Sequence, residues 1–320
     1  MSELRSVDRA EIIILVDNAI DWSSANDHNN IFTPRQWVGE REELHYLQGG
    51  HGFSALVRVR IENDVHTVLY DTGPSADLIA HNVQTLGIDL GVVDAIAMSH
   101  GHYDHFGGLD WILSKITRKP IPVHVHPRMF MSRAVQKKPD DESARRNLPD
   151  IISKNMIREV GGEPITNTEP VLLCDDTFLL SGEVPRTTQW ETGFKGHIAF
   201  VDGVWQDDHE VIDDQCLIIN IKGKGLVILS GCSHAGIVNM TKYGSELTGV
   251  KRVEAVIGGL HLIGAKDSKI ESTVASMKII KPSMIVPTHC TGWKAQRHME
   301  NVLKQSFARS SVGNMYVFQS

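Results

Sequence analysis

Ser99-His100-Gly101-His102-Tyr103-Asp104-His105 is the stretch of this sequence that decides its fold and its chemistry. Three histidines and one carboxylate lie within six consecutive positions, directly after a short apolar run. Imidazole and carboxylate suit zinc, iron or manganese. In an extended segment His100 and His102 point the same way, and a turn after them lets Asp104 and His105 face a second ion. The alternative is a polar junction whose histidines only form hydrogen bonds, but that explanation suits single histidines better than four dense ligand-type residues.

Length, charge and cysteine usage limit the class of protein. The 320 residues are enough for a substantial core, and we expect a single domain spanning 1–320. The net charge of −7 argues against a nucleic-acid partner, because phosphate binding needs clustered Lys and Arg. The four cysteines show no Cys-x-x-Cys pairing, which favours a reduced, cytoplasmic protein. The polar N-terminus is unlike a signal peptide, and no apolar stretch approaches a membrane span. The oligomeric state stays open.

Hydrophobic patterning predicts an α/β organisation. Helical spacing of apolar residues predicts helices at 76–86, 270–280 and 296–307. Two sheets packed face to face with helices outside would fit the mixture of alternating helices and hairpin-like pairs. Two polar stretches with scattered aromatic residues, 21–51 and 185–214, are expected to form lids or binding loops, or else packed surface loops. Short β-branched runs predict strands at 12–16, 55–61, 67–70, 94–98, 121–125, 216–221, 226–229, 253–257 and 284–286.

Several motifs resemble one known family. His-x-His-x-Asp-His after an apolar strand resembles the signature of the metallo-β-lactamase superfamily, and Asp71-Thr72-Gly73 resembles its first motif. The resemblance implies an αβ/βα sandwich of two mixed β-sheets flanked by helices, with metals held in loops along one edge. Further segments are similar to the branch named after an archaeal dihydropteroate-synthase-like enzyme of methanopterin synthesis, and they run in the expected order: 99–109, 180–185, 230–239, 258–262 and 287–292.

The resemblance also implies a ligand set. It makes metal ligands of His100, His102, Asp104 and His105, and it makes His289 the last metal histidine. Zinc is the expected ion, with Mn²⁺ or Fe²⁺ as alternatives.

One part of the sequence departs from the family pattern. The strand-end Asp that commonly bridges the two ions is replaced by Cys232, and His234 follows two positions later. We expect His234 to be a ligand and Cys232 to lie behind the ligands, although a thiolate also binds zinc and a free cysteine is most often a buried small hydrophobe. The usual middle histidine has no counterpart in 180–185. Either His234 takes over that role or one site is incomplete, so one ion and two ions both stay open.

Three further roles follow from the resemblance. His261, in a glycine-paired loop that lies beside the substrate in related branches, is expected to stabilise an oxyanion or act as an acid; a structural hydrogen bond is the alternative. Asp71 is expected to organise the ligands from behind. Asp104 is expected to be both a ligand and a proton shuttle, so Asp104 and His261 are the candidate catalytic residues.

Three functions compete at this stage. Two cations about 3.5–4 Å apart can activate water and polarise an electrophile. We therefore expect a hydrolase that uses a metal-bound hydroxide on a small cyclic amide, ester or phosphoester. The branch name suggests instead a synthase joining a pterin diphosphate to an aminobenzene ribotide. A non-catalytic binding module is the third, against which the intact ligand motif argues. The aromatic-rich loops suit a small substrate with a flat ring, and the overall acidity favours the hydrolase.

Overall fold

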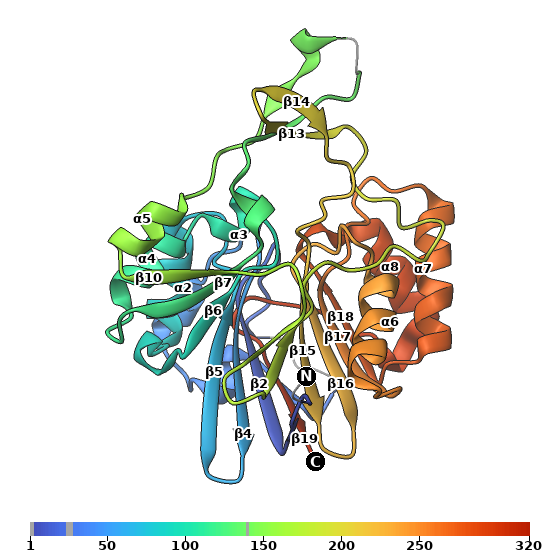
Figure 1. Ribbon diagram of the computed structural model, residues 1–320. Coiled ribbons are helices and arrows are strands. Elements are labelled where there is room, and N and C mark those ends of the chain that lie inside the picture. Colours follow the sequence, from blue (N-terminus) through green and yellow to red (C-terminus); the bar gives the residue numbers. More distant parts are fainter. Residues whose placement is uncertain (1–2, 24–27, 139–140) are drawn as a thin grey trace.

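The computed structural model describes residues 3–23, 28–138 and 141–320, and its main body is a sandwich of two mixed β-sheets (Figure 1). The larger sheet has the strand order β10-β7-β6-β5-β4-β2-β19-β3. Its strands are β2 (Arg9–Val16), β3 (Ile31–Phe32), β4 (Ser54–Ile61), β5 (Asp64–Tyr70), β6 (Ala95–Ala97), β7 (Ile121–Val125), β10 (Gly162–Thr166) and β19 (Met315–Gln319).

The second sheet has the order β11-β12-β15-β16-β17-β18, and the short β1 pairs with β15. Its strands are β1 (Ser6–Val7), β11 (Val171–Leu173), β12 (Phe178–Leu180), β15 (Cys216–Ile221), β16 (Gly225–Ser230), β17 (Val253–Gly259) and β18 (Met284–Thr288). Within it β16, β17 and β18 run parallel, as do β5, β6 and β7 in the first sheet. Parallel strands end at the same edge of a sheet, so the residues after them gather in one place.

Helices cover the outer face of each sheet, with α2, α4 and α5 over the first and α6, α7 and α8 over the second (Figure 1). The α-helices are α1 (Pro34–Trp37), α2 (Ala76–Leu86), α3 (Tyr103–Phe106), α4 (Leu109–Lys115), α5 (Lys154–Glu159), α6 (Ile237–Thr248), α7 (Asp267–Ile280) and α8 (Trp293–Leu303). The 3₁₀ turns are η1 (Glu42–Tyr46), η2 (Leu90–Val92), η3 (Pro127–Phe130), η4 (Glu142–Ala144), η5 (His289–Thr291) and η6 (Lys304–Ser306). Among the described helices, none is both long and apolar enough to cross a bilayer.

The main core lies between the two sheets. Alternate residues of the strands face inward, so that Val57 and Tyr70 of one sheet belong to the same buried cluster as Leu217 and Ile257 of the other. The Tyr70 hydroxyl donates a hydrogen bond of 2.8 Å to the Gln215 carbonyl across this interface. Two further clusters lie beneath the outer helices. The αβ/βα architecture implied by the resemblance is confirmed.

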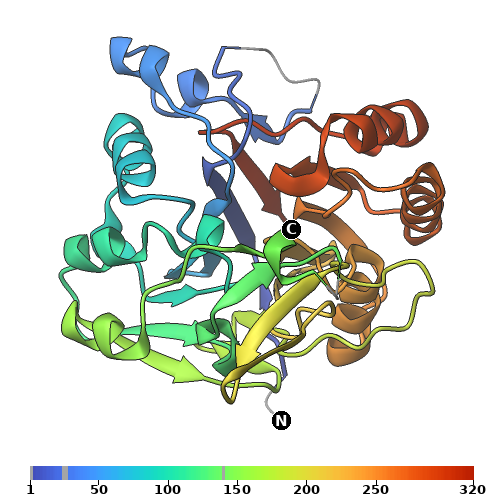
Figure 2. The ribbon, with the colours of Figure 1, turned by 90° about the horizontal axis from the view of Figure 1, so that it is seen from above.

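A third, small sheet forms an arm that projects beyond the sandwich (Figure 1). Its order is β14-β13-β8-β9, with β8 (Arg133–Val135), β9 (Arg146–Asn147), β13 (His197–Val201) and β14 (Val204–Asp207). Seen from above, the arm crosses the boundary between the two halves of the sandwich (Figure 2). Residues 197–207 of the segment 185–214, which was expected to form a lid, a binding loop or a packed surface loop, are therefore a hairpin of this arm.

The sequence does contain a signal for that hairpin. Asp202 and Gly203 both have positive φ values, 50° and 85°, as the two central residues of a type I′ turn require. The alternation of buried His197 and Ala199 with the outward-facing Ile198 is the pattern of a half-covered strand. Of the other expected loop, 21–51, residues 24–27 lie outside the described residues, and the remainder contains β3, α1 and η1.

The segment between β12 and β13 is fastened to the beginning of α6 by one buried carboxylate. Glu191 accepts hydrogen bonds from the backbone N–H groups of Val238 and Asn239, at 2.9 and 3.0 Å, and from the Thr188 hydroxyl at 2.9 Å. The first N–H groups of a helix have no partner within the helix, and they favour a negative charge. Glu191 thus satisfies the N-terminus of α6 and fixes the segment that precedes the arm.

Replacing Glu191 by Ala should lower the free energy of unfolding by about 1–3 kcal/mol, because two buried N–H donors lose their acceptor. Urea titration of the metal-free protein measures this loss. Glu246→Ala is the matched control, since Glu246 is exposed on the same helix, and it should change stability by less than about 0.5 kcal/mol. Equal effects of the two substitutions would contradict the capping role.

Candidate metal centre

The sequence-predicted ligands meet at one edge of the sandwich because each follows the end of a strand. His100 comes three residues after β6, and Cys232 and His234 come two and four residues after β16. His289 directly follows β18, and Asp71 directly follows β5. The six predicted ligands and Asp71 lie close together. All seven residues are buried, with at most 8% of their surface exposed.

Two glycines allow the strand ends to approach this closely. A Cβ atom on Gly231 would lie 2.1 Å from Ser99 Oγ and 2.7 Å from Asp71 Oδ2. Gly258 has φ +133°, and a Cβ atom there would lie 2.0 Å from the Ser230 carbonyl oxygen. Any side chain at either position would push β16 away from its neighbours. The paired glycines before His261 are therefore required by the backbone packing.

His100, His102 and His234 form a three-histidine group. The distance between His100 Nε2 and His102 Nδ1 is 2.9 Å, and that between His100 Nε2 and His234 Nε2 is 3.2 Å. These three side chains offer ligand atoms that all lie within 4.8 Å of one another. The segment 180–185 brings no histidine here; its Glu183 lies 3.0 Å from His126 Nε2. His234 is thus the third histidine of this group, beside the two histidines of the motif.

Asp104, His289 and His51 form a second group, the Asp104 group, whose ligand atoms also lie within 4.8 Å of one another. His289 Nε2 is 3.3 Å from Asp104 Oδ2, and His51 Nε2 is 3.8 Å from the same oxygen. His289 is held from behind by Asp17, which accepts its backbone N–H at 2.8 Å, and by Asn18, whose Oδ1 lies 3.2 Å from Nδ1. Nε2 of His289 is buried and faces the Asp104 carboxylate, so these two atoms could serve one cation.

His105 and Cys232 lie between the two groups. Cys232 Sγ is 3.3 Å from His105 Nε2, and these two atoms belong to one ligand cluster with His100. Burial, together with the neighbouring Cys290, raises the pKa of the Cys232 thiol. A bound cation would favour the thiolate instead, because a metal-coordinating thiol is deprotonated.

The hydrogen bonds behind His100 and His105 fix which ring nitrogen of each is free. The Ser99 hydroxyl has one proton, which it donates to Asp71 Oδ2 at 2.7 Å, so it accepts from His100 Nδ1 at 2.9 Å. His105 Nδ1 donates to Asp71 Oδ2 at 2.7 Å. In both residues Nε2 therefore faces the cluster, and it carries the lone pair when the ring is neutral. Burial lowers the pKa of His105, but Asp71 and Asp104 outweigh this effect and raise it to about 9, so a bound cation would have to displace the Nε2 proton of that ring.

Burial also sets the charge state of the three-histidine group. Burial lowers the pKa of His100, His102 and His234 well below the usual value, and the neighbouring histidines lower it further. These rings are therefore neutral at pH 7, which is the form that binds metal. Burial raises the pKa of Asp104, but nearby His105 and His289 outweigh this effect and hold it below the usual range. Asp104 is thus an anion within the cluster.

His261 lies beside the three-histidine group. Its ring centroid is 4.2 Å from that of His234, and its Nδ1 is buried without a hydrogen-bond partner. Its backbone N–H lies 3.3 Å from Cys290 Sγ. The backbones of Asp71, Ser233, His261 and His289 all have φ values between 43° and 59°. Such conformations are rare outside glycine and cluster at functional sites.

Two histidines of this region were missed by the sequence analysis. His51 lies between the pair Gly49-Gly50 and Gly52. A Cβ atom on Gly52 would lie 2.5 Å from the Asp104 carbonyl oxygen, so only glycine fits at that position. Glycines on both sides of a histidine are a sequence signal that this segment packs closely against another one, which here is the ligand motif. His197 lies on β13, and its Nε2 is 2.9 Å from His102 Nε2. It stood in a segment without evident periodicity, so the sequence offered little to single it out.

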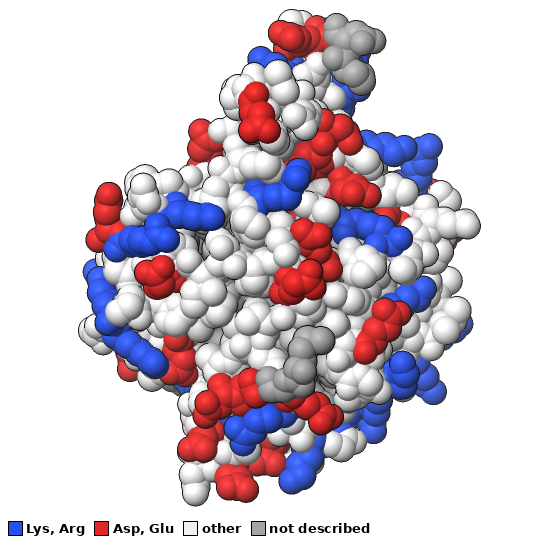
Figure 3. Space-filling model, viewed as in Figure 1, with Lys and Arg blue, Asp and Glu red and all other residues white. Residues whose placement is uncertain are grey.

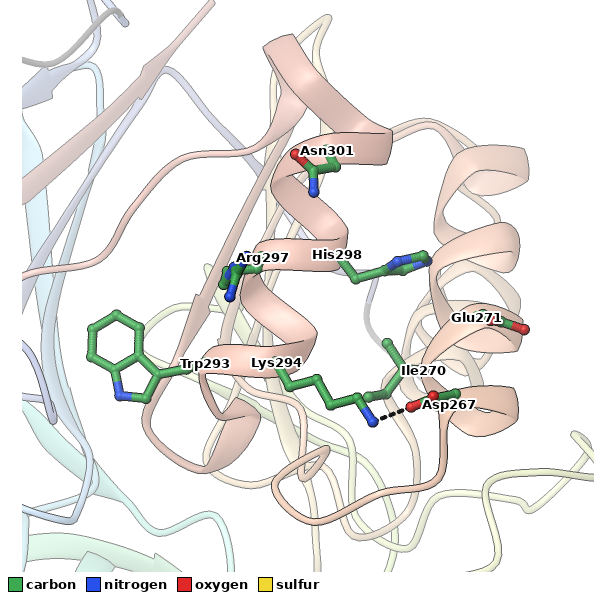
Figure 4. A pocket seen from close by; sticks show the side chains of 8 residues that line it. All are labelled: Asp267, Ile270, Glu271, Trp293, Lys294, Arg297, His298 and Asn301. Atoms are coloured by element: carbon green, nitrogen blue, oxygen red, sulfur yellow. Dashed lines mark ion pairs between the residues drawn. The ribbon is translucent and has the colours of Figure 1, made fainter.

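Other surface features do not coincide with this cluster. On the face shown in Figure 3, acidic and basic side chains are interspersed. A groove of about 430 Å³ lies between α7 and α8 (Figure 4), where Lys294 forms an ion pair with Asp267 and Trp293 is largely exposed. None of the residues that line this groove belongs to the two ligand groups.

The sequence of the chain is similar to that of known proteins. The model of the metallo-β-lactamase superfamily matches residues 48–206. A protein of Methanocaldococcus jannaschii named 7,8-dihydropterin-6-methyl-4-(β-D-ribofuranosyl)-aminobenzene-5′-phosphate synthase is 32% identical over 273 residues, covering 84% of this chain and 90% of that protein. This chain belongs to the metallo-β-lactamase superfamily.

Other relatives agree with that assignment. An uncharacterised protein of the same archaeon is 31% identical over 269 residues, covering 83% of this chain and 92% of that protein. A crystal structure described as a metal-dependent hydrolase of the β-lactamase superfamily superposes with a TM-score of 0.74 at 23% identity, covering 97% of this chain and all of that one. This likeness shows the same fold.

The residues present fit the metal ions that members of this superfamily typically bind. Imidazole nitrogen, carboxylate oxygen and thiolate sulfur are the donors that zinc takes, at about 2.0–2.3 Å. Nε2 of His289, His100 and His105 is in each case a buried atom that faces another candidate ligand, and a cation would give these converging atoms a common partner.

Replacing Asp71 by Asn should weaken metal binding about 10- to 100-fold, because the amide no longer favours the tautomers that free Nε2 in His100 and His105. Chelator competition on the purified protein measures the affinity. Asp110→Asn, on the exposed surface of α4, is the control and should leave it unchanged. Native affinity in the Asp71 variant would show that this carboxylate does not organise the ligands.

Proposed function

We propose that this protein is a metal-dependent hydrolase with two zinc ions, acting on a small cyclic amide, ester or phosphoester. The observation that carries the proposal is the convergence of the three-histidine group and the Asp104 group around the shared pair His105 and Cys232. One group would hold each ion. Mn²⁺ and Fe²⁺ are compatible with the same nitrogen and oxygen donors.

Two bound cations would supply both Lewis acidity and, from water, a nucleophile at neutral pH. The chain's own residues would then move the protons. Asp104 is ionised, is 11% exposed at its side chain, and keeps an oxygen beside His289, so it can bind a metal and accept a proton during bond cleavage. His261 faces the same space with an unpartnered Nδ1 and is placed to donate to an oxyanion or a leaving group.

The surroundings of the cluster favour a small ring-shaped substrate. Phe194 lies 5.1 Å from His261 and stacks at 5.8 Å on His234, so an aromatic face borders the site. Arg133 and Arg186 are cationic side chains that could bind a diphosphate, but both already have partners within the protein. Arg133 is buried with Asp213, and Arg186 donates to the carbonyl of nearby Val184 and to that of Val211 in the segment after β14. These commitments favour the hydrolase over a diphosphate-dependent reaction.

A synthase is the second candidate, and the 32% identity to the named archaeal synthase is the observation that favours it. In that case the same cluster would act on a pterin diphosphate and an aminobenzene ribotide. The cations would then stabilise a departing diphosphate, and no water would be consumed. The two candidates differ in their products.

Metal analysis combined with a substrate panel tests the proposal. The protein as purified should contain zinc or a related ion at up to two per chain, and it should hydrolyse a member of a panel of lactams, lactones and phosphodiesters. Removal of the metal with a chelator should abolish this turnover, and zinc should restore it. Formation of a condensation product from a pterin diphosphate, without hydrolysis of the panel, would support the synthase instead. Protein that binds no divalent metal would overturn both.

The Asp104→Ala variant should lose turnover by at least about a thousandfold, because a ligand and the proposed proton acceptor disappear together. The cluster lies at the edge of the sandwich, so the variant should stay folded by circular dichroism. Asp110→Ala is the control. Near-native activity in a metal-loaded Asp104 variant would contradict the catalytic role.

The His261→Ala variant should keep its metal content and lose turnover by about ten- to a thousandfold, since the imidazole is assigned to the substrate. Metal analysis and kinetics on this single variant separate the possibilities. Loss of an ion would make His261 a ligand, whereas unchanged kinetics would leave it with a structural hydrogen bond.

A further inference from the structure

We propose that His197 is a positioning residue that fixes the tautomer of His102, so that the arm controls metal binding by the three-histidine group. The inference rests on metal binding at that group and not on which reaction the protein catalyses. His197 is fully buried on β13, and its Nε2 lies 2.9 Å from His102 Nε2.

The backbone of Asp208 determines the direction of this hydrogen bond. His197 Nδ1 lies 3.0 Å from the Asp208 carbonyl oxygen and 3.3 Å from the carboxylate oxygen Oδ2 of the same residue; both oxygens can only accept, so Nδ1 carries a proton. A neutral imidazole has one proton, and Nε2 of His197 is then an acceptor. The proton between the two rings therefore belongs to His102 Nε2.

This leaves the lone pair of His102 on Nδ1, the atom that faces His100. His100 Nε2 also carries a lone pair, because its Nδ1 donates to Ser99. The two nitrogens are 2.9 Å apart with no proton between them. Two facing lone pairs repel each other unless a cation lies between them, and His234 Nε2, 3.2 Å from His100 Nε2, completes a three-nitrogen site.

His197 is not itself a ligand of this group. One of its ring nitrogens is used by the Asp208 carbonyl and the other by His102. It belongs to none of the ligand clusters formed by the described residues. Its ring also stacks on Phe194, with centroids 5.4 Å apart and planes inclined by 26°, which restricts its orientation.

A second contact joins the arm to the same motif. Arg133 of β8 forms a buried ion pair with Asp213, and Asp213 accepts the backbone N–H of Gly101 at 2.9 Å. Gly101 lies between the two histidines of the motif. One strand of the arm thus orients the backbone of the ligand motif, and another orients the side chain of His102. The arm and the three-histidine group should therefore form one unit.

Zinc affinity of the native protein and of three His197 variants tests the proposal. Chelator competition, read as two dissociation constants, should show that His197→Leu weakens one of the two ions about 10- to 100-fold and leaves the other unchanged. Cobalt-substituted protein should show a changed d–d spectrum for that one ion. His197→Gln should restore most of the affinity, because its amide oxygen reaches the position of Nε2 and can accept from His102. His197→Ala should resemble the Leu variant.

His209→Gln is the matched control, since this partly exposed histidine of the same region forms an ion pair with Asp207 and belongs to none of the ligand clusters of the described residues. It should bind both ions as the native protein does. Native affinity in His197→Leu, equal weakening of both ions, or loss as large in His197→Gln as in His197→Leu would each overturn the proposal. Urea unfolding of the metal-free variants shows whether they are folded. If His197→Leu is unfolded and the other variants are not, the zinc affinity of His197→Gln tests the proposal in its place. Failure of the native protein to bind metal would instead refute the proposed function.

Discussion

The arrangement of the candidate metal ligands depends on the hydrogen bonds that the Asp71 carboxylate accepts. It is fully buried, and it accepts three short hydrogen bonds, from the Ser99 backbone, the Ser99 hydroxyl and His105 Nδ1, each 2.7 Å long. A buried charge is costly unless it is fully hydrogen-bonded, so these donors can hardly move independently. Through Ser99 the same carboxylate also orients His100. One anion at the end of β5 thereby determines the free nitrogen of two candidate ligands.

Close approach of two strand edges is the second requirement, and it explains why small residues surround the cluster. Gly231 lies against the Ser99 and Asp71 side chains, and Gly258 lies against the Ser230 backbone. Cys232 and His234 then enter from the second sheet while His100 and His105 enter from the first. With a larger residue at Gly231, the two halves of the ligand set could not meet.

Much of this arrangement could be predicted from the sequence, because strands and ligand motifs leave local signals. The strand 121–125 and the helix 76–86 agree with β7 and α2 to the residue, because the spacing of apolar residues is a local signal. The predicted helix 296–307 begins late and runs too far, because Lys304 has φ +47° and α8 ends at Leu303. The dense pattern at 100–105 indicates four ligand-type residues by itself, and the resemblance, through the order of motifs along the chain, adds His234 and His289.

What the sequence could not provide are contacts made by non-local pairing. His197 is 95 residues from His102, and nothing in its neighbourhood marks it as a partner of that side chain. The same holds for Asp213, which reaches Gly101 across 112 residues. Such contacts form only when the hairpin of β13 and β14 docks beside β8. The Asp-Gly turn predicts the hairpin but not where the hairpin docks.

The two candidate metal groups are held by different parts of the fold, because the arm contacts one of them, the three-histidine group. The Asp104 group is held by Asp17 and Asn18 at the end of β2, inside the main sandwich. The three-histidine group is held from outside by His197 and by Arg133 through Asp213, both on a small sheet with only short strands. Short peripheral sheets open locally at lower free energy than central strands. Because linkage is reciprocal, an ion that binds the ordered arm better than the open one must also stabilise the arm. If His197 and Arg133 act as proposed, order in the arm and occupancy of the three-histidine group are coupled equilibria, and the Asp104 group depends on them less.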